Sequence, residues 1–299
     1  MRALLGPVET VLTILFLVSV MLEIGLEVTP EELGATARNK GLIARSLLAN
    51  FVLVPILGLF LASLLPMPAD LETGFLLLAA APGALFATQF TRLMRGGIPF
   101  AASLLFVLTL LSVAISPFIA WVMLPVNTSL ALPYARVVRF LMLAVIVPWL
   151  AGEAIQQWQR SLARRLLQPA RLCAAVSFVA VTILTLAVKS TATRRVGARG
   201  LIAMLLLALG SMAIGWILGG PKVENRRVLA IGTSMRNVAL CLAIAFHNFP
   251  GRDVDVPVVA FSALIVPLNA LFAGFQMWKE RRRLKRPPDG QRDEPAIAA

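Results

Sequence analysis

The sequence is poor in the residues on which most enzyme and metal chemistry depends. Its 299 residues include one histidine, two cysteines and one tyrosine, and only 14% of them are charged. Both cysteines, Cys173 and Cys241, fall in apolar segments, so neither a disulfide framework nor a paired metal-ligand motif is expected. The single histidine is His247, and the sequence shows no nucleophile–base pair. We therefore predict a protein that is not an enzyme and carries no cofactor.

Acidic residues are scarce, with 15 Asp and Glu against 28 Lys and Arg and a formal net charge of +13. Such a balance can indicate nucleic-acid binding. Here, however, the basic residues lie mainly in short loops and in the run KERRRLKR at 279–286. Membrane proteins place Lys and Arg in these positions. Because no basic patch is interleaved with exposed aromatic residues, we exclude nucleic acid as a partner.

Long apolar runs are abundant. Hydrophobic residues make up 59% of the chain, and the mean hydropathy is +0.83. A soluble domain of this length requires far more polar surface, whereas a run of about 20 apolar residues lets a helix cross a bilayer. We predict an all-α polytopic membrane protein with nine transmembrane helices, at about 8–28, 42–65, 71–94, 99–124, 134–158, 170–190, 199–219, 226–248 and 256–278.

An odd number of spans places the two termini on opposite sides of the membrane. With a cytoplasmic C-terminus, the inner loops and tail carry more than twice as many Lys and Arg as the outer segments, as the positive-inside rule requires. The prediction is a multi-pass protein of the cell inner membrane with its N-terminus outside. Residues 1–278 form the transmembrane domain, and 279–299 form a basic, disordered cytoplasmic tail.

Two of the predicted spans are interrupted near their middle. The third contains Pro82 and Gly83, and the eighth contains Gly232, Thr233 and Ser234. Either break alone is best interpreted as an ordinary kink. A broken helix in each half of the chain is instead typical of secondary transporters with inverted repeats and a binding site near the bilayer midplane. As a pair, the breaks therefore predict a site.

Arg236 lies in the eighth span, eight residues after Val228, where the apolar stretch begins; a helix places it roughly 12 Å from that point. Intramembrane charges are rare and usually functional. A guanidinium presents a planar fork of donors that suits a carboxylate, sulfonate or sulfate. The structural alternative is that Arg236 pairs with a buried acid, Glu23 or Glu153.

Several segments resemble the bile acid:sodium symporter family. They are PGALFATQFTRLMRGG (82–97) continuing into 98–117, SMRNVAL (234–240), LLANFVLVPILG (47–58) and MLEIGLEVTPEEL (21–33). The resemblance covers most of the chain. It implies a panel domain at about 8–28 and 134–190 and a core domain at about 42–124 and 199–278. Within the core, the two discontinuous helices are expected to cross.

The resemblance also implies two sodium sites next to this crossing, but the chain departs from the family at nearly every ligand. A family glutamate is replaced by Gly232 and a glutamine by Arg236. The family positions fall on Gly232, Arg236, Ala87, Thr88, Ala101, Leu105 and Asn50. Two positive charges about 4 Å apart repel by about 4 kcal/mol at an effective dielectric constant near 20. We therefore expect no metal at this site, with the charge of Arg236 replacing that of the sodium ions.

These observations lead to three functional hypotheses. The first is a secondary transporter or facilitator that moves small or amphipathic organic anions by alternating access, without family-type sodium coupling. The second is an organic anion symporter that couples to sodium or protons through a rearranged ion site, and the third is a non-transporting membrane sensor. The expected partners are the lipid bilayer and an organic anion. The expected substrate-binding residues are Arg236, Asn237, Thr88, Asn50, Thr233 and Ser234.

Overall fold

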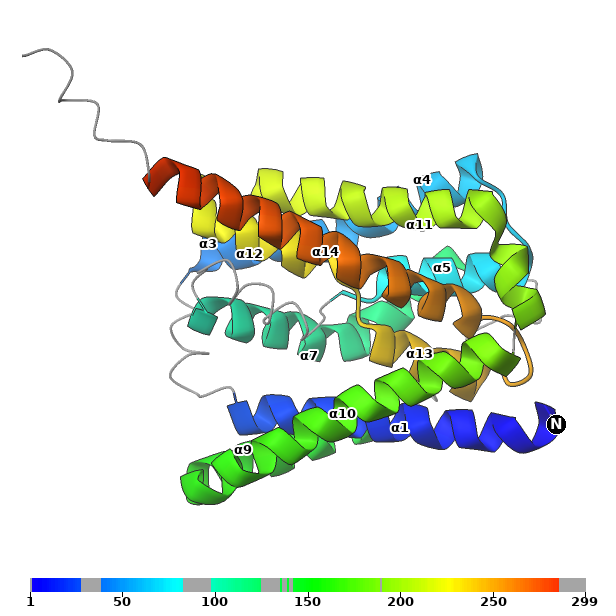
Figure 1. The fold of residues 1–299 in the computed structure, drawn as a ribbon, viewed down its shortest axis with the longest axis horizontal. Coiled ribbons are helices and arrows are strands. Elements are labelled where there is room, and N and C mark those ends of the chain that lie inside the picture. Colours follow the sequence, from blue (N-terminus) through cyan, green and yellow to red (C-terminus); the bar gives the residue numbers. More distant parts are fainter. Residues whose placement is uncertain are drawn as a thin grey trace, which may run out of the picture.

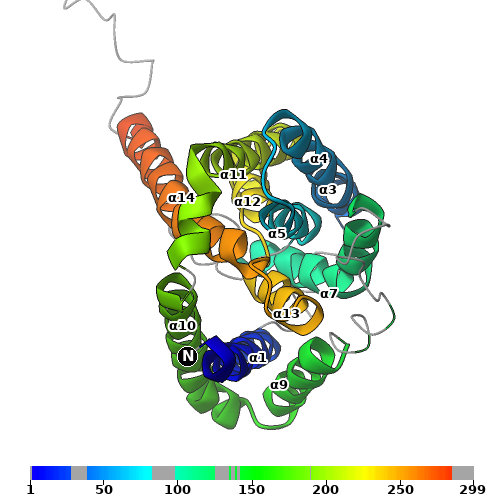
Figure 2. The ribbon, with the colours of Figure 1, turned by 90° about the vertical axis from the view of Figure 1, so that its right-hand side faces the viewer.

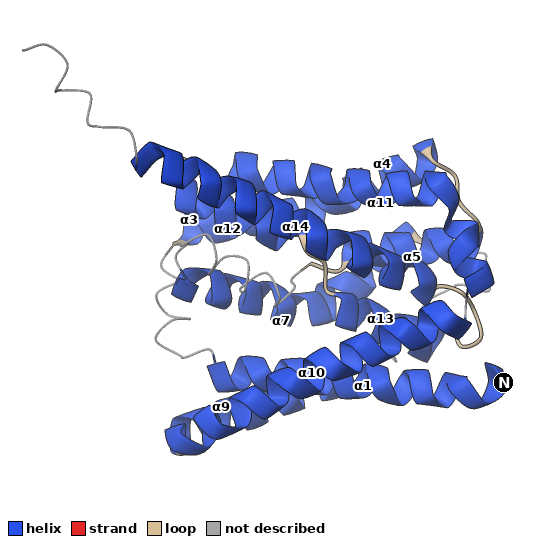
Figure 3. Cartoon of the chain, viewed as in Figure 1, coloured by secondary structure: helices blue, strands red, loops and turns tan. Residues whose placement is uncertain are grey.

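The computed structural model describes residues 2–27, 39–82, 98–124, 135, 139, 142–188 and 190–284. Every named element in this part of the chain is a helix (Figure 3). The first half contains α1 (Arg2–Glu27), α3 (Lys40–Leu48), η1 (Ala49–Leu53), α4 (Val54–Leu64), α5 (Ala69–Ala80) and α7 (Ile98–Met123). The second half contains η2 (Met142–Ile146), α9 (Val147–Trp158), α10 (Arg160–Val188), α11 (Ser190–Leu218), α12 (Val223–Ser234), α13 (Val238–Asn248) and α14 (Asp255–Leu284).

Three helical stretches in the described part of the chain are long and apolar enough to cross a bilayer: Lys40–Leu64, Val196–Leu218 and Asp255–Arg282. Large apolar side chains also lie exposed on the outside of the bundle, among them Ile56, Phe60, Ile217 and Leu271. A surface of this kind is suited to lipid rather than to water. The prediction of an all-helical membrane protein is thus confirmed, whereas the number of spans and the inverted repeats stay predictions.

The long helices run side by side, and the N-terminus and the C-terminal end of α14 lie at opposite ends of the bundle (Figure 1). Seen along the bundle, α1, α9 and α10 form one group, and α3, α4, α5, α7, α11 and α12 form another (Figure 2). α14 contacts both groups through α10 and α11. The division into a panel and a core domain stays a prediction.

α5 lies in the interior of the larger group. From Leu71 to Ala80 all its side chains are buried except that of Glu72, which is only partly exposed. A helix that is apolar all round is stable only when other helices surround it. Leu78 and Ala79, in its last turn, are fully buried. The C-terminal end of α5 therefore lies deep inside the protein, where its backbone oxygens need internal partners.

The C-terminal helix extends further than the sequence indicates. α14 continues to Leu284, so the predicted disordered tail from 279 is helical up to that residue. Two interactions support the extension. Arg282 lies over the Trp278 ring, 3.9 Å from its centroid, and Glu280 forms an ion pair with Arg227 of α12 at 2.8 Å. The rest of the predicted tail lies outside the described residues.

Candidate functional site at the crossing of two broken helices

The two predicted helix breaks meet in space. α5 ends at Ala80, and Pro82 pairs with Arg236 as an isolated antiparallel bridge. The backbone N–H of Asn237 donates to the carbonyl of Ala81 at 3.0 Å. Two extended segments from opposite halves of the sequence thus lie against each other between helix ends. We call residues 78–82 and 233–237 the crossover.

The second break lies a few residues later than the sequence suggested. Gly232, Thr233 and Ser234 are the last residues of α12, and the chain becomes extended at Met235. Asn237 accepts a hydrogen bond from the Leu240 N–H at 3.1 Å through its side-chain oxygen and so begins α13. Of the first predicted break, Pro82 is non-helical, and Gly83 lies outside the described residues.

Arg236 is the central residue of the crossover, with 1% of its surface exposed. Its Nε donates to the Leu78 carbonyl at 2.8 Å, and Nη2 donates to the Ala79 carbonyl at 2.6 Å. Its Nη1 donates to the Asn50 side-chain oxygen and to the Thr233 carbonyl, both at 3.3 Å. Four oxygen atoms from three segments of the chain therefore surround one guanidinium.

The surroundings of Arg236 are suited to a positive charge. Leu78 and Ala79 lie in the last turn of α5, where carbonyl oxygens lack the usual donor one turn further on; the Leu78 oxygen also accepts from the Ala81 N–H at 3.3 Å. The helix dipole makes this end negative, so a cation is stabilised there. A buried charge is tolerated only with such compensation. The guanidinium therefore finds hydrogen-bond acceptors at the end of α5, and these buried carbonyl oxygens find donors.

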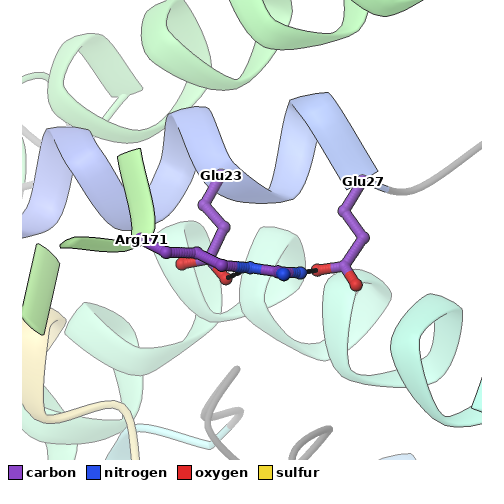
Figure 4. Close-up of polar contacts among 3 residues, drawn as sticks. All are labelled: Glu23, Glu27 and Arg171. Atoms are coloured by element: carbon purple, nitrogen blue, oxygen red, sulfur yellow. Dashed lines mark hydrogen bonds and ion pairs between the residues drawn. The ribbon is translucent and has the colours of Figure 1, made fainter. Parts of the chain in front are cut away.

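The acids proposed as structural partners of Arg236 bond elsewhere. Arg171 of α10 lies between Glu23 and Glu27 of α1, with nitrogen–oxygen distances of 3.0 and 2.8 Å (Figure 4). Glu153 accepts a hydrogen bond from Gln157 at 2.8 Å. Arg236 bonds to backbone and amide oxygens instead. The alternative that paired Arg236 with Glu23 or Glu153 is therefore wrong.

Replacing Arg171 by glutamine is expected to lower the free energy of unfolding by about 1–3 kcal/mol. The change leaves two carboxylates one helical turn apart with no cation between them. Thermal unfolding of purified protein checks this. The triple variant that also carries Glu23→Gln and Glu27→Gln should recover much of the loss, because no like charges then face each other. Equal melting temperatures for Arg171→Gln and the native chain would show that the pair contributes nothing.

Two other predicted residues, Asn50 and Thr233, contact Arg236, whereas Ser234 does not. Asn50 lies in the π-helical turn η1, a distortion that is frequent at functional sites. Its amide nitrogen donates to the Thr233 hydroxyl at 3.4 Å and to the Ser46 carbonyl at 3.0 Å. The hydroxyl of Ser234 donates to the side-chain oxygen of Asn269 at 2.9 Å and so turns toward α14. The structure thus groups Arg236, Asn50 and Thr233 and directs Ser234 to another neighbour.

The sequence analysis missed two kinds of partner. Asn269 is fully buried in the middle of α14; the single amide among the apolar letters of VPLNALFAG could have indicated it. The carbonyls of Leu78 and Ala79 have no side-chain signal at all. Among the family's sodium-ligand positions, Ala87 and Thr88 lie outside the described residues, and Ala101 and Leu105 lie in α7 with side chains that are not described.

Comparison with known proteins finds relatives among membrane transporters. The chain is similar to a probable sodium/metabolite cotransporter, BASS1, of Arabidopsis thaliana chloroplasts, with 27% identity over 89% of this chain and 66% of the relative. It is also similar to BASS1 of rice, Oryza sativa subsp. japonica, with 25% identity over 87% of this chain and 64% of the relative. A third relative is the uncharacterized sodium-dependent transporter YocS of Bacillus subtilis, with 23% identity over 83% of this chain and 77% of the relative.

The chain thus spans slightly less than two thirds of the two plant proteins. The sequence profile described as the Sodium Bile acid symporter family matches residues 14–197, which include α5 and the position of Asn50. This match covers more than half of the chain and includes the first helix break. The chain belongs to the sodium bile acid symporter family.

Proposed function

We propose that the protein is a secondary transporter or facilitator of small or amphipathic organic anions that works by alternating access without family-type sodium coupling. The proposal includes nine spans in the inner membrane, with the N-terminus outside and the C-terminus in the cytoplasm. The group of α1, α9 and α10 would serve as the panel and the larger group as the core. Membership of the family and the crossing of two broken helices support this assignment.

The observation that carries the proposal is a permanent positive charge enclosed at the crossover. Arg236 is held there without a carboxylate partner among the described residues. A guanidinium remains charged in proteins. An anion about 4 Å from it gains about 4 kcal/mol at an effective dielectric constant near 20. An anionic group is therefore the substrate feature that the crossover can distinguish.

The substrate's anionic group is placed beside Arg236, with Asn237, Asn50, Thr233, Ser234 and Thr88 as candidate polar contacts. The first four are all buried, none of them exposing more than 6% of its surface. A substrate therefore reaches them only when the core and panel move apart on one side. This is the motion that alternating access provides. Four of the five N–H donors of Arg236 are engaged by oxygens of the described residues, so an anion would contact the remaining Nη2 N–H or replace one of these oxygens.

The decisive experiment is flux through proteoliposomes. Purified protein is reconstituted, and uptake of a panel of carboxylates and sulfonates is measured against protein-free vesicles. Saturable uptake that an excess of unlabelled anion inhibits supports a transporter. Binding of an anion without any flux would favour the sensor hypothesis. A panel that neither binds nor crosses contradicts the proposal.

Transport is expected to be unchanged when sodium is replaced by potassium or choline at constant ionic strength. Gly232 has no side chain, and alanine and leucine stand at three of the family's ligand positions, so side-chain oxygens are missing. The initial uptake rate in the three salts checks this. A steep sodium dependence that saturates at millimolar concentration would contradict it.

A second candidate is an anion symporter that couples to sodium or protons at other residues. The names of the three relatives favour it. Two are probable sodium/metabolite cotransporters, and one is a sodium-dependent transporter. An imposed sodium gradient and an imposed pH gradient distinguish this candidate, because each can drive accumulation only of a substrate coupled to that ion. Equilibration without accumulation under both gradients is the result expected for the first candidate.

A further inference from the structure

The atoms around Arg236 form a set of ligands suited to a cation. Three are backbone carbonyl oxygens, from Leu78, Ala79 and Thr233, and the fourth is the Asn50 side-chain oxygen. None of the four carries a negative charge. In transporters with broken helices, unwound carbonyls and the C-terminal ends of half-helices are the groups that coordinate the coupling cation. In this protein the side chain of Arg236 donates hydrogen bonds to these oxygens instead.

The positions of these oxygens explain why one guanidinium can satisfy them all. The Leu78 and Ala79 carbonyls belong to successive residues and receive Nε and Nη2, which lie side by side in the planar fork. Nη1 bridges the remaining two oxygens, one from η1 and one from the last turn of α12. The side chain thus ties the end of α5 to α12 and to η1. Each of the three elements contributes an oxygen that would otherwise be buried without a donor.

A sodium ion and Arg236 do not fit in this place together. The guanidinium nitrogens lie 2.6–3.3 Å from all four oxygens, so an added ion would have to displace them and would meet a like charge at close range. The amide nitrogen of Asn50 points to Thr233, so the Asn50 oxygen is the only part of that side chain directed at Arg236. The family's sodium is thus incompatible with the residues present.

We propose that Arg236 is a tethered cation, which permanently fills a cation-binding position formed by the end of α5, the end of α12 and Asn50. The crossover then keeps its positive charge through the whole cycle, with no ion to bind or release. The role of this tethered cation in transport rests on the proposed function. In this role Arg236 is a positioning residue, because its donors hold protein oxygens.

The proposal has a consequence that a general packing role does not share. Removing the side chain should leave a position lined by the same four acceptors. A small cation should then bind it and restore part of the lost stability, because ligands that bind only the folded protein raise its melting temperature. A soluble guanidinium ion matches the donor geometry, and sodium matches the oxygen ligands. A large cation without N–H donors matches neither.

The test is thermal unfolding of detergent-purified Arg236→Ala. It is measured in three salts at equal ionic strength: guanidinium chloride, sodium chloride and tetramethylammonium chloride. The guanidinium concentration is kept well below the denaturing range. The matched control is Asn269→Ala, which also loses a buried polar group near the crossover but no cation. We expect a saturable rise of several degrees in guanidinium or sodium for Arg236→Ala alone. No cation-specific rise, or an equal rise in the control, overturns the proposal.

Two further variants keep the test decisive if Arg236→Ala does not fold. Arg236→Lys retains a charge that can reach part of the oxygen set, whereas Arg236→Gln retains a donor without charge. A clearly higher yield of folded Arg236→Lys supports the tethered cation, and equal yields contradict it. Because melting temperature is measured without flux, cation rescue in a protein that moves no anion would refute the proposed function and leave this inference standing.

Discussion

Arg236→Gln is expected to weaken anion binding about ten- to a hundredfold and to lower the melting temperature in the same preparation. A charge-assisted interaction at a buried guanidinium is worth roughly 1.5–3 kcal/mol, and each 1.4 kcal/mol corresponds to about a tenfold change in affinity. The melting temperature falls because the Ala79 carbonyl loses the Nη2 donor and the Leu78 carbonyl keeps only the Ala81 N–H, in a site that water does not reach. Isothermal titration with a bound carboxylate or sulfonate, together with thermal unfolding, measures both effects.

Arg236→Lys separates charge from geometry in this prediction. Lysine keeps the positive charge but not the planar fork that reaches four oxygens. Affinity should therefore recover more than stability does. If Arg236→Gln unfolds at a much lower temperature while its surviving fraction binds the anion with unaltered affinity, the charge has no part in substrate binding. Arg236 would then be purely structural.

Replacing Gly25 by valine is expected to cost at least about 3 kcal/mol of folding free energy. α1 and α9 cross at Gly25 and Gly152 with their backbones in contact. A Cβ atom at Gly25 would collide with the Trp149 carbonyl oxygen and lie 2.8 Å from the Glu153 nitrogen. Small residues allow such an approach between membrane helices. Backbone atoms on the facing helix cannot move aside as a flexible side chain can.

Gly152→Val should have the same effect, because a Cβ there would lie 2.7 Å from the Leu22 carbonyl oxygen and 2.9 Å from the Gly25 Cα. The matched control is Gly274→Ala in α14, where nothing lies within 4 Å of the added atom. Alanine also favours a helix over glycine by about 1 kcal/mol, so the control should be neutral or slightly stabilising. Native-like melting of Gly25→Val would contradict the close packing of these helices.

Composition alone determined the class of the protein. The chain has few charged residues, one histidine and apolar runs of membrane-spanning length. This composition indicates a helical membrane protein. The sequence also located both helix breaks to within a few residues, because proline and a local cluster of polar residues interrupt apolar segments at equivalent places. It singled out Arg236 for the same reason, as a permanent charge in such a segment.

The partners of Arg236 could be decided only by the tertiary structure. From the sequence, the candidate partners were the acids Glu23 and Glu153, because a partner of opposite charge can be recognised from its residue type. The structure supplies carbonyls instead, since the end of a broken helix exposes backbone oxygens whatever its side chains are. Leu78 and Ala79 carry no polar side chain, and they are far from Arg236 along the chain. Backbone acceptors that folding brings together cannot be recognised from residue types. For this reason the sequence identified the charge of Arg236, and only the fold identified the oxygens that bind it.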